Sequence, residues 1–398
     1  FPTRRSSDLL AKALYERYLT VPPIDFLYGG KLFSENLSDW GRSEIAGENG
    51  MTVSYTDSAA SLTVVIDYRF YDDSSAVEWG IRLKNDGAGK SKLIENFRTL
   101  SLQSQSKGNT KLLYSKGGNA KADDFALQTE ALMNGESCKV FSAGGRSSSG
   151  VMPFFNLYTD KDAGFIGAIG WSGQWSLQAE KENGTVTLSC GMSDSKFYLN
   201  AGENVMQPTM LLIPWEGRAQ EAHNDLRRHI LAHHTPKMAD GGLPVGPIAY
   251  GVWGGTESQT QLSQIKAIDN IDIGEDALWM DAGWNGSDDA ISQNTFDSIW
   301  FENAGSWNEV PSLYPNGMKE VADAAHEAGL AFILWFEPER AFKGTKLVTE
   351  HPEYFLSFGS NPDNFIVDLG NEEARLWLTD YVAGLIQAYG VDEYRHSP

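Results

Sequence analysis

Carboxylate and tryptophan side chains recur in this sequence at points where short apolar runs end. Asp281 follows the run 277–280, and Glu337 follows the run 330–336. The residues at or just beyond such ends are Trp253, Asp281, Trp284, Trp335, Glu337, Glu339 and Arg395. Carboxylates can act as acid, base or nucleophile on glycosidic bonds, and indole faces pack on pyranose rings. Packing or loop capping explains each residue taken singly, but the set together favours sugar chemistry.

The apolar runs before these residues alternate with helical segments from residue 243 onward. Four strands are predicted, at 245–253, 277–280, 330–336 and 391–395, with helices between them. The last helix is predicted to begin after Asn371 and to end at Gly390. Because repeated strand–helix units build a parallel sheet, the carboxyl ends of the strands should meet at one rim.

Two parallel architectures could hold these units, an open doubly wound sheet or a (β/α)8 barrel. A doubly wound sheet usually has a glycine-rich phosphate loop after its first strand, and residues 251–255 (Gly-Val-Trp-Gly-Gly) match that loop poorly. We therefore favour a barrel, of which four strands make the first half.

Upstream, from about residue 25 to 215, the apolar residues repeat with a period of two. The clearest alternating positions are Leu62, Val64, Ile66, Tyr68, Val77, Trp79, Ile81 and Leu83. Alternation bounded by Asp, Asn, Gly and Ser clusters predicts antiparallel strands with one buried face. A large β-sandwich is the simplest architecture for so many strands.

The segment 216–240 between these regions is predicted to be a polar helical linker. His229 and His233 stand four residues apart, with His234 adjacent, a spacing that could hold a metal. No Glu follows the first histidine, as a zinc protease would require, so we expect a solvated helix face.

Composition excludes several classes of function. The net charge of −21 opposes binding to nucleic acid and to anionic membranes, and no apolar run reaches the ~18–20 residues of a membrane span. Cys138 and Cys190 are the only cysteines, so a disulfide framework is excluded, although one bridge is left open. We expect no metal, nucleotide or flavin cofactor.

The first nine residues are not expected to belong to the fold. Residues 1–9 contain Arg4 and Arg5 but no apolar stretch, so they are not a signal peptide, and we interpret them as a sequencing artefact. The true N-terminus is then expected to be missing. Localisation is undecided on this basis, with the cytoplasm slightly favoured.

An ordered series of motifs resembles glycoside hydrolase family 36, the α-galactosidase or melibiase group of clan D. The motifs are 278–284 (Leu-Trp-Met-Asp-Ala-Gly-Trp), 305–307 (Gly-Ser-Trp), 314–319 (Tyr-Pro-Asn-Gly-Met-Lys), 334–339 (Leu-Trp-Phe-Glu-Pro-Glu), 351–354 (His-Pro-Glu-Tyr) and 368–371 (Asp-Leu-Gly-Asn). Residues 144–148 and 170–175 similarly resemble the β-supersandwich of that family. The resemblance covers nearly everything after residue 25.

This resemblance implies the fold class β + α/β, with an N-terminal β-supersandwich followed by a truncated (β/α)8 TIM barrel of about four βα units. The expected domains are the supersandwich at 10–215, incomplete at its N-terminus, the linker at 216–240 and the first half of the catalytic barrel at 241–398.

The resemblance also implies a retaining hydrolase that releases terminal α-linked galactose and needs no cofactor. Asp281 is expected to hold sugar hydroxyls, Trp335 to wall the subsite and Glu337 to order the rim. Trp284 and Arg395 complete the expected substrate-binding set. The expected partner is an α-galactoside oligosaccharide, and a homo-oligomer is left open because family members often assemble.

Three positions depart from the family pattern. Ala282 and Ser306 stand where the family commonly has Asp, which puts strict galactose specificity in doubt. Ser397 occupies the place of the nucleophilic Asp, and a serine without a paired base cannot form the glycosyl-enzyme. We therefore expect the parent protein to be the hydrolase and this chain to be inactive. The alternatives are a non-catalytic carbohydrate-binding or scaffold protein, or a related α-glycosidase with another sugar specificity.

Overall fold

The computed structural model describes residues 6–57, 62–106, 108–253, 257–271, 274–289, 299–359 and 361–396. The chain divides into two compact units, unit 1 (Phe1–Lys237) and unit 2 (Met238–Pro398), each with its own hydrophobic core. None of the helices in the described ranges is long and apolar enough to cross a membrane. Ser397 lies outside the described residues.

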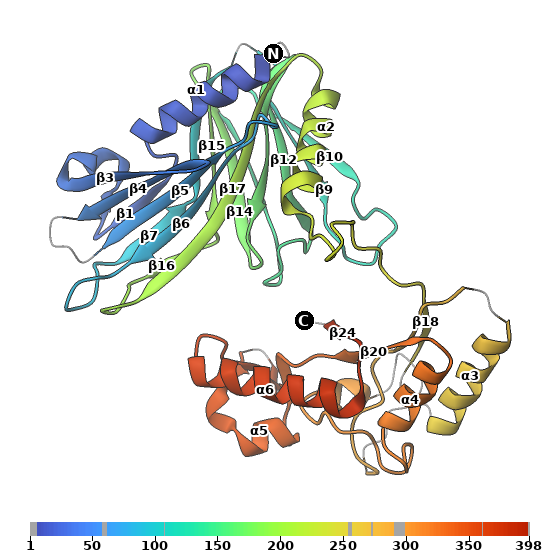
Figure 1. Ribbon diagram of the computed structural model, residues 1–398. Helices are drawn as coiled ribbons and strands as arrows, with labels where there is room; N and C mark the ends of the chain where they lie inside the picture. Colours follow the sequence, from blue (N-terminus) through green and yellow to red (C-terminus); the bar gives the residue numbers. More distant parts are fainter. Residues whose placement is uncertain are drawn as a thin grey trace. The chain divides into compact units, whose positions relative to one another are not determined.

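Unit 1 is dominated by a large antiparallel sheet (Figure 1). Its strands are β3 (Trp40–Gly47), β4 (Gly50–Asp57), β5 (Thr63–Phe70), β6 (Val77–Lys84), β9 (Lys111–Lys116), β10 (Leu127–Ala131), β12 (Val151–Asp160), β13 (Ala163–Gly170) and β17 (Asn204–Glu216). Over the described residues they pair in the order β10-β9-β12-β13-β17-β6-β5-β4-β3. This single sheet therefore contains strands from β3 near the start of the unit to β17, its last strand.

Unit 1 also contains two smaller sheets, whose strands are interspersed in the sequence with those of the large sheet. Their strands are β1 (Asp25–Tyr28), β2 (Lys31–Leu32), β7 (Ile94–Arg98), β8 (Leu100–Gln105), β11 (Glu136–Phe141), β14 (Trp175–Glu182), β15 (Thr185–Met192) and β16 (Lys196–Phe197). They pair as β11-β14-β15-β8 and β16-β7-β1-β2, and a 3-10 helix, η1 (Ser34–Asp39), follows β2. Cys138 of β11 and Cys190 of β15 are both free thiols, with β14 between their strands.

The predicted alternation in unit 1 is confirmed at the centre of its core. Tyr68 lies opposite Trp79 and Ile66 opposite Ile81 in the β5–β6 register, and all four side chains are buried. Polar residues between them take the other face of the pleat. Period-two patterning therefore placed these side chains correctly, because a one-residue slip would have moved them all to the opposite face.

Two helical segments pack on the sheets of unit 1. In α1 (Ser6–Thr20), Leu9 is exposed, whereas Ala11, Leu14 and Tyr18 are buried in the sandwich core. The hydroxyl of Tyr68 donates to the main-chain oxygen of Tyr18 at 2.9 Å. Sequence reasoning did not predict this helix.

The second segment is α2 (Ala219–His229), which continues into the π-helix η2 (Ile230–His234). Ala222 and Leu226 of α2 pack against Ile213 and Trp215. The predicted helix at this position is confirmed. The expectation of a solvated face is wrong for His229, whose side chain is buried.

Unit 2 is built on a parallel sheet with strand order β18-β19-β20-β24 among the described residues. The strands are β18 (Ala249–Val252), β19 (Ala277–Met280), β20 (Ala331–Phe336) and β24 (Glu393–His396). Spatial order follows chain order and each neighbouring pair is parallel. This sequential order is that of a barrel segment, because a doubly wound sheet reverses direction at a switch point.

Helices connect these strands and cover one face of the sheet (Figure 1). They are α3 (Ser258–Ile271), α4 (Lys319–Glu327) and α6 (Glu372–Tyr389), with α5 (Lys346–Glu350) and the 3-10 helices η3 (Ile299–Asn303) and η4 (Pro352–Tyr354) in the connections. A small antiparallel sheet, β21 (Arg340–Phe342), β23 (Asn361–Val367) and β22 (Phe355–Phe358), lies between β20 and α6 in the sequence.

The ends of the longest helix agree with the sequence prediction. The side chain of Asn371 accepts a hydrogen bond from the Glu373 N–H at 3.0 Å, which caps the first turn of α6. Gly390 ends the helix in the left-handed conformation, with φ of 72°. The first predicted strand is shorter than expected, because Val245 and Ile248 are exposed and β18 begins only at Ala249.

Alternation along the parallel strands separates the two faces of this sheet. Met280, Leu334 and Phe336 belong to the core shared with the helices. Trp279 and Arg395 point to the opposite face, as strand alternation requires. In a barrel, ligands bind at the carboxyl ends of the strands. The residues at these ends and on the second face are therefore the candidates for ligand contact.

Candidate active site

The carboxyl ends of the parallel strands bring the predicted rim residues onto neighbouring chain segments. Asp281 comes directly after β19, and its N–H donates to the Val252 oxygen at the end of β18, at 2.9 Å. Trp335 lies opposite Arg395 in the β20–β24 register. Glu337 comes directly after β20. Parallel pairing thus gathers residues separated by more than a hundred positions.

Asp281 is partly exposed and its carboxylate is oriented by its own loop. Its Oδ1 accepts a hydrogen bond from the Ala282 N–H at 2.7 Å. Ala282 itself is buried, with 1% of its surface exposed. A carboxylate held in this way at a strand end is suited to accepting hydrogen bonds from sugar hydroxyls.

Trp335 stands within a chain of tryptophan rings beside the rim. Its ring centroid lies 5.5 Å from that of Trp300 and 5.5 Å from that of Trp307, and Trp253 contacts Trp300 in turn at 5.8 Å. The contacts are edge-to-face, the arrangement favoured by aromatic quadrupoles. Because Trp335 is only 3% exposed, its orientation is fixed by this packing.

Trp284 packs in the core and contacts the last residues of β20. Its side chain is fully buried, packs edge-on against Phe336 at 5.4 Å and donates its indole N–H to the Trp335 oxygen at 2.9 Å. In this structure the indole lies in the core, so the predicted sugar contact of Trp284 stays a prediction.

Glu337 is engaged by an arginine that sequence reasoning missed. Arg340 Nε donates to Glu337 Oε1 and Arg340 Nη2 to Oε2, both at 2.6 Å. Arg340 Nη1 donates to Asn364 Oδ1 at 3.0 Å as well. A bidentate pair of this kind fixes the orientation of the carboxylate, which fits an ordering role. The sequence feature that could have predicted this pair is the arginine three residues after Glu337, in the run Glu-Pro-Glu-Arg at 337–340.

Arg395 faces an indole on the next strand but one. Its guanidinium carbon lies 5.4 Å from the ring centroid of Trp279. This cation–π distance stabilises the guanidinium over the second face of the sheet. The neighbouring His396 Nε2 lies 3.4 Å from the Glu339 carboxylate, so a polar contact joins β24 to the segment after β20.

A partly buried hydrogen bond joins α6 to the loop after Trp307. The Tyr389 hydroxyl donates to Glu309 Oε2 at 2.6 Å. Burial, and then the hydrogen bond to Glu309, raise the pKa of Tyr389 well above its usual value. The Tyr389 hydroxyl therefore stays protonated and acts as a hydrogen-bond donor to Glu309, which joins α6 to the loop after Trp307.

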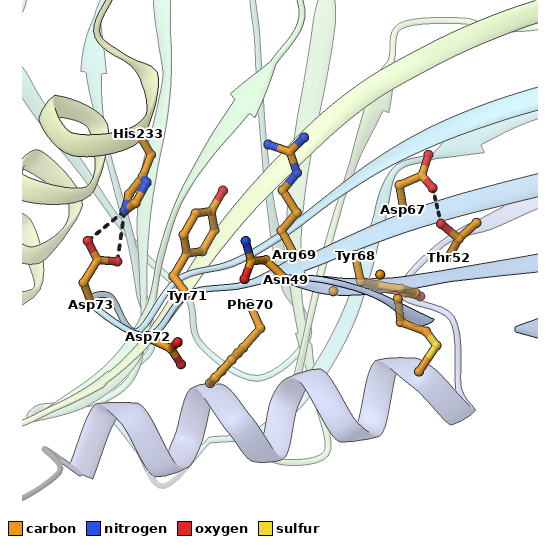
Figure 2. A pocket seen from close by; sticks show the side chains of 13 residues that line it. Asn49, Thr52, Asp67, Tyr68, Arg69, Phe70, Tyr71, Asp72, Asp73 and His233 are labelled. Carbon is orange, nitrogen blue, oxygen red and sulfur yellow. Dashed lines mark hydrogen bonds and ion pairs between the residues drawn. The ribbon is translucent and has the colours of Figure 1, made fainter. Parts of the chain in front are cut away.

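Unit 1 also has a polar hollow of about 670 Å³, lined by β4, β5 and the turn after β5 (Figure 2). Asp67 Oδ1 accepts from Thr52 Oγ1 at 2.6 Å, and Asp73 pairs with His233 at 3.0 Å. These two carboxylates already have partners from neighbouring segments, so we assign the hollow no ligand.

Comparison with protein-family models covers both units. Residues 35–200 match the glycosyl hydrolase family 36 N-terminal domain, and residues 215–395 match Melibiase. The chain belongs to glycoside hydrolase family 36. The predicted family is therefore confirmed.

Curated relatives of this family 36 chain are α-galactosidases. It is 24% identical to α-galactosidase Mel36A of Lactobacillus acidophilus, over 86% of this chain and 47% of that protein. It is 23% identical to α-galactosidase AgaA of Geobacillus stearothermophilus, over 83% of this chain and 45% of that protein. The chain thus spans about half the length of the curated relatives it matches.

Solved structures of family 36 have the same fold. AgaB of Geobacillus stearothermophilus superposes with a TM-score of 0.72 at 17% identity, over 94% of this chain and 54% of that one. AgaA gives a TM-score of 0.70 at 18% identity, over 86% of this chain and 48% of that one. These likenesses confirm the predicted fold class, a β-supersandwich followed by part of a (β/α)8 barrel.

Proposed function

We propose that this chain supplies the sugar-binding part of an α-galactosidase-type retaining glycoside hydrolase. Its substrate would be terminal α-linked galactose on oligosaccharides or glycoconjugates. The observation that carries the proposal is the convergence of Asp281, Trp335 and Arg395 at the strand ends of a family 36 barrel.

Each rim residue takes a role that fits its surroundings. Asp281, partly exposed and oriented by the Ala282 N–H, accepts sugar hydroxyls. Trp335 walls the subsite with an indole whose position Trp300 and Trp307 fix. Arg395 donates hydrogen bonds from the opposite strand, while Trp284 and Glu337 position the rim.

The chemical step needs two carboxyl groups, one as nucleophile and one as acid and base. The fourth-strand position expected to hold the nucleophile is Ser397, which lies outside the described residues. Glu337 is committed to Arg340 and is poorly placed to substitute. We therefore propose that the 398-residue chain binds a galactoside but does not turn it over.

Hydrolysis of p-nitrophenyl α-galactoside tests this proposal. A longer protein that includes this chain and the rest of a family 36 barrel should hydrolyse it, and the 398-residue chain should not. Turnover by the chain alone would contradict its assignment as the sugar-binding part. Binding without turnover by the longer protein would favour the non-catalytic alternative.

The substrates of relatives suggest which oligosaccharides to use. Variants of AgaA from Geobacillus stearothermophilus have been solved in complex with stachyose and with raffinose. Release of galactose from these two sugars by the longer protein would place it among enzymes acting on α-galactoside oligosaccharides.

A related sugar is a second candidate, and Ala282 is the observation that favours it. The methyl group of Ala282 cannot accept a hydrogen bond where the family commonly has a carboxylate. Ser306 Oγ, at the other departure, accepts the Lys346 N–H at 3.2 Å. One relative matched over 69 residues at 38% identity is a galactosaminidase acting on A type blood galactosamine, from Flavonifractor plautii. The substrate panel should therefore include an α-galactosaminide.

A further inference from the structure

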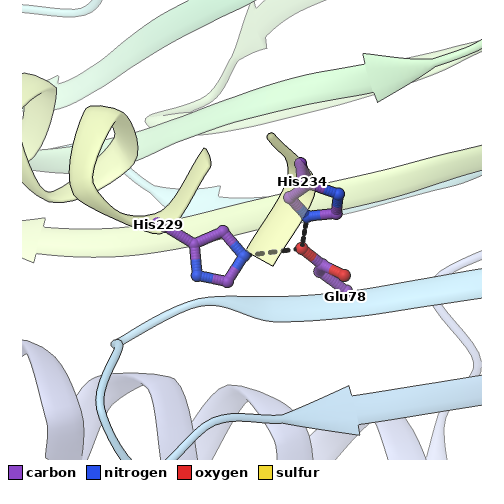
Figure 3. A group of neighbouring side chains, drawn as sticks. All are labelled: Glu78, His229 and His234. Atoms are coloured by element: carbon purple, nitrogen blue, oxygen red, sulfur yellow. Dashed lines mark hydrogen bonds and ion pairs between the residues drawn. The ribbon is translucent and has the colours of Figure 1, made fainter. Parts of the chain in front are cut away.

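Two histidines and one glutamate of unit 1 meet at a single point outside the rim (Figure 3). His229 Nε2 lies 2.7 Å and His234 Nε2 2.5 Å from the same oxygen, Glu78 Oε1. The three ligand-type atoms lie within 4.8 Å of one another. Glu78 comes from β6, whereas both histidines come from the helical segment α2–η2.

The π-helix brings these two histidines together. His229 and His234 are five residues apart, and at ~100° per residue an α-helix would separate their directions by roughly 140°. The i→i+5 hydrogen bond from the Thr235 N–H to the Ile230 oxygen, 2.8 Å long, widens the turn between them. Both imidazoles can therefore face β6, and π-turns are frequent at functional sites.

The outer contacts of the cluster are those that metal ligands need. His229 Nδ1 lies 2.9 Å from Ser74 Oγ, a hydroxyl that fixes the orientation of the ring. The Tyr71 hydroxyl donates to Glu78 Oε2 at 2.7 Å and leaves Oε1 directed at the histidines. Metal-bound histidines almost always have such a partner on the second ring nitrogen.

Charge and access also suit a cation. Burial opposes ionisation of Glu78, but hydrogen bonds from His229, Tyr71 and His234 outweigh it and lower the pKa of Glu78 to about 2. The carboxylate is thus charged at neutral pH. Glu78 and His234 line a cavity of about 520 Å³, together with Asp67 and Arg69, and the His234 side chain is 45% exposed. An ion could reach the cluster from this cavity.

We propose that Glu78, His229 and His234 bind a divalent transition-metal ion of the Zn²⁺ type, which fastens the α2–η2 segment to β6. Two imidazoles and one carboxylate are a common donor set for Zn²⁺, with bonds of about 2.0–2.2 Å. Movements of the side chains by less than about 1 Å would open the present hydrogen-bonded arrangement to those bond lengths. The fourth coordination position would face the cavity.

Titration of Zn²⁺ into the chelator-treated chain, in competition with a chromophoric chelator, tests the proposal. One ion should bind per chain, and the Co²⁺ form should show no thiolate charge-transfer band from Cys138 or Cys190. His234→Ala is the principal variant, because its half-exposed side chain can be removed without opening the core. This variant should weaken binding by more than about tenfold, and Ser74→Ala by roughly 10–100-fold.

His233→Ala is the matched control. His233 lies on the same π-helix and its ring packs against His229 and Tyr71, but its Nε2 pairs with Asp73 instead of Glu78, so its loss should change the affinity less than about twofold. Circular dichroism of each variant checks that unit 1 remains folded. Three results would overturn the proposal: no Zn²⁺ binding by the wild-type chain, equal binding by His234→Ala, or an equal loss of affinity in His233→Ala. The cluster would then be a set of hydrogen bonds that joins α2–η2 to β6.

Discussion

Trp284 donates its indole N–H to the main-chain oxygen of Trp335, 2.9 Å away. The bond joins the loop after β19 to the end of β20 and involves two residues of the predicted sugar site. Both side chains are buried in the core of unit 2, and Trp335 lies next to the carboxyl end of β20. The rim is therefore held in place by the same packing that closes the core of unit 2.

Trp284→Phe should destabilise unit 2 by about 1–3 kcal/mol, because the Trp335 oxygen loses its buried partner and the core loses volume. The midpoint of urea unfolding, followed by tryptophan fluorescence, measures the effect. Leu376→Ala on the exposed face of α6 is the control and should stay within about 0.5 kcal/mol of the parent. An equal loss in both variants would contradict a specific role for the indole.

Arg340→Met should cost about 3–5 kcal/mol, since it leaves the poorly exposed Glu337 carboxylate without its cation. Adding Glu337→Gln to that variant should recover part of the loss. The control is Lys343→Met, which removes an exposed ion pair with Asp363 worth about 0–1 kcal/mol. Urea unfolding of the parent, Arg340→Met, Glu337→Gln and the double variant gives the coupling energy of the pair, and additive losses would argue against coupling.

In a longer, active protein, Asp281→Asn should lower kcat/KM roughly 10–150-fold, the value of a hydrogen bond to a charged group. Steady-state hydrolysis of p-nitrophenyl α-galactoside measures this. Asp323→Asn, an exposed carboxylate on α4 paired with Lys319, is the matched control and should leave kcat/KM unchanged. Unchanged kinetics in Asp281→Asn would remove this residue from the sugar site.

Acid should weaken unit 1 through Glu78. Its pKa falls from an ordinary 4.5 to about 2 in the folded state, a difference that corresponds to on the order of 3 kcal/mol. Because the folded state binds the proton less tightly, this stability is present above pH 4.5 and is lost as the pH falls to about 2. In metal-free protein, Glu78→Gln should lack this part of the pH dependence.

Chemical unfolding of the chelator-treated protein between pH 6 and pH 2 would record the difference between the parent and Glu78→Gln. The exposed Glu180→Gln serves as control and should follow the parent curve. Parallel curves for the parent and Glu78→Gln would show that the carboxylate is not stabilised by its three donors.

The two thiols should react at very different rates. Burial raises the pKa of Cys190 to about 12, and this residue is fully buried, whereas Cys138 is only partly buried. Iodoacetamide at pH 8 should therefore modify Cys138 first and Cys190 only after unfolding. Peptide mass spectrometry follows both sites, and early modification of Cys190 would indicate that β15 opens in the native state.

Much of the fold followed from periodicity. Alternation placed Ile66, Tyr68, Trp79 and Ile81 in the core of unit 1, and the cap at Asn371 placed the start of α6. These features depend on local patterns that tertiary contacts reinforce. The start of β18 was predicted too early, because an apolar run such as that from Val245 carries no sign of whether it will be covered.

The site was only partly predictable. The positions of Asp281 and Glu337 directly after neighbouring parallel strands were predicted from the ends of the apolar runs, and their roles toward a sugar stay predictions. The partner of Glu337 required the small sheet that begins at Arg340, which the sequence pattern did not predict. His234 is exposed, as the sequence predicted, but its contact with Glu78 was not predicted, because a helical periodicity of 3.6 directs His234 away from His229 and gives no sign of a π-turn.

The π-turn of η2 also determines what the deletion of one residue in this segment would do. An α-helix shortened by one residue between His229 and His234 would leave them four residues apart, roughly 40° in direction, and so on the same face. Deletion of Leu231 or Ala232 could therefore keep both imidazoles beside Glu78 while it converts the π-turn to regular helix. In this segment we therefore expect a one-residue deletion to disturb the Glu78 contacts less than substitution of either histidine, the reverse of what is usual within a helix.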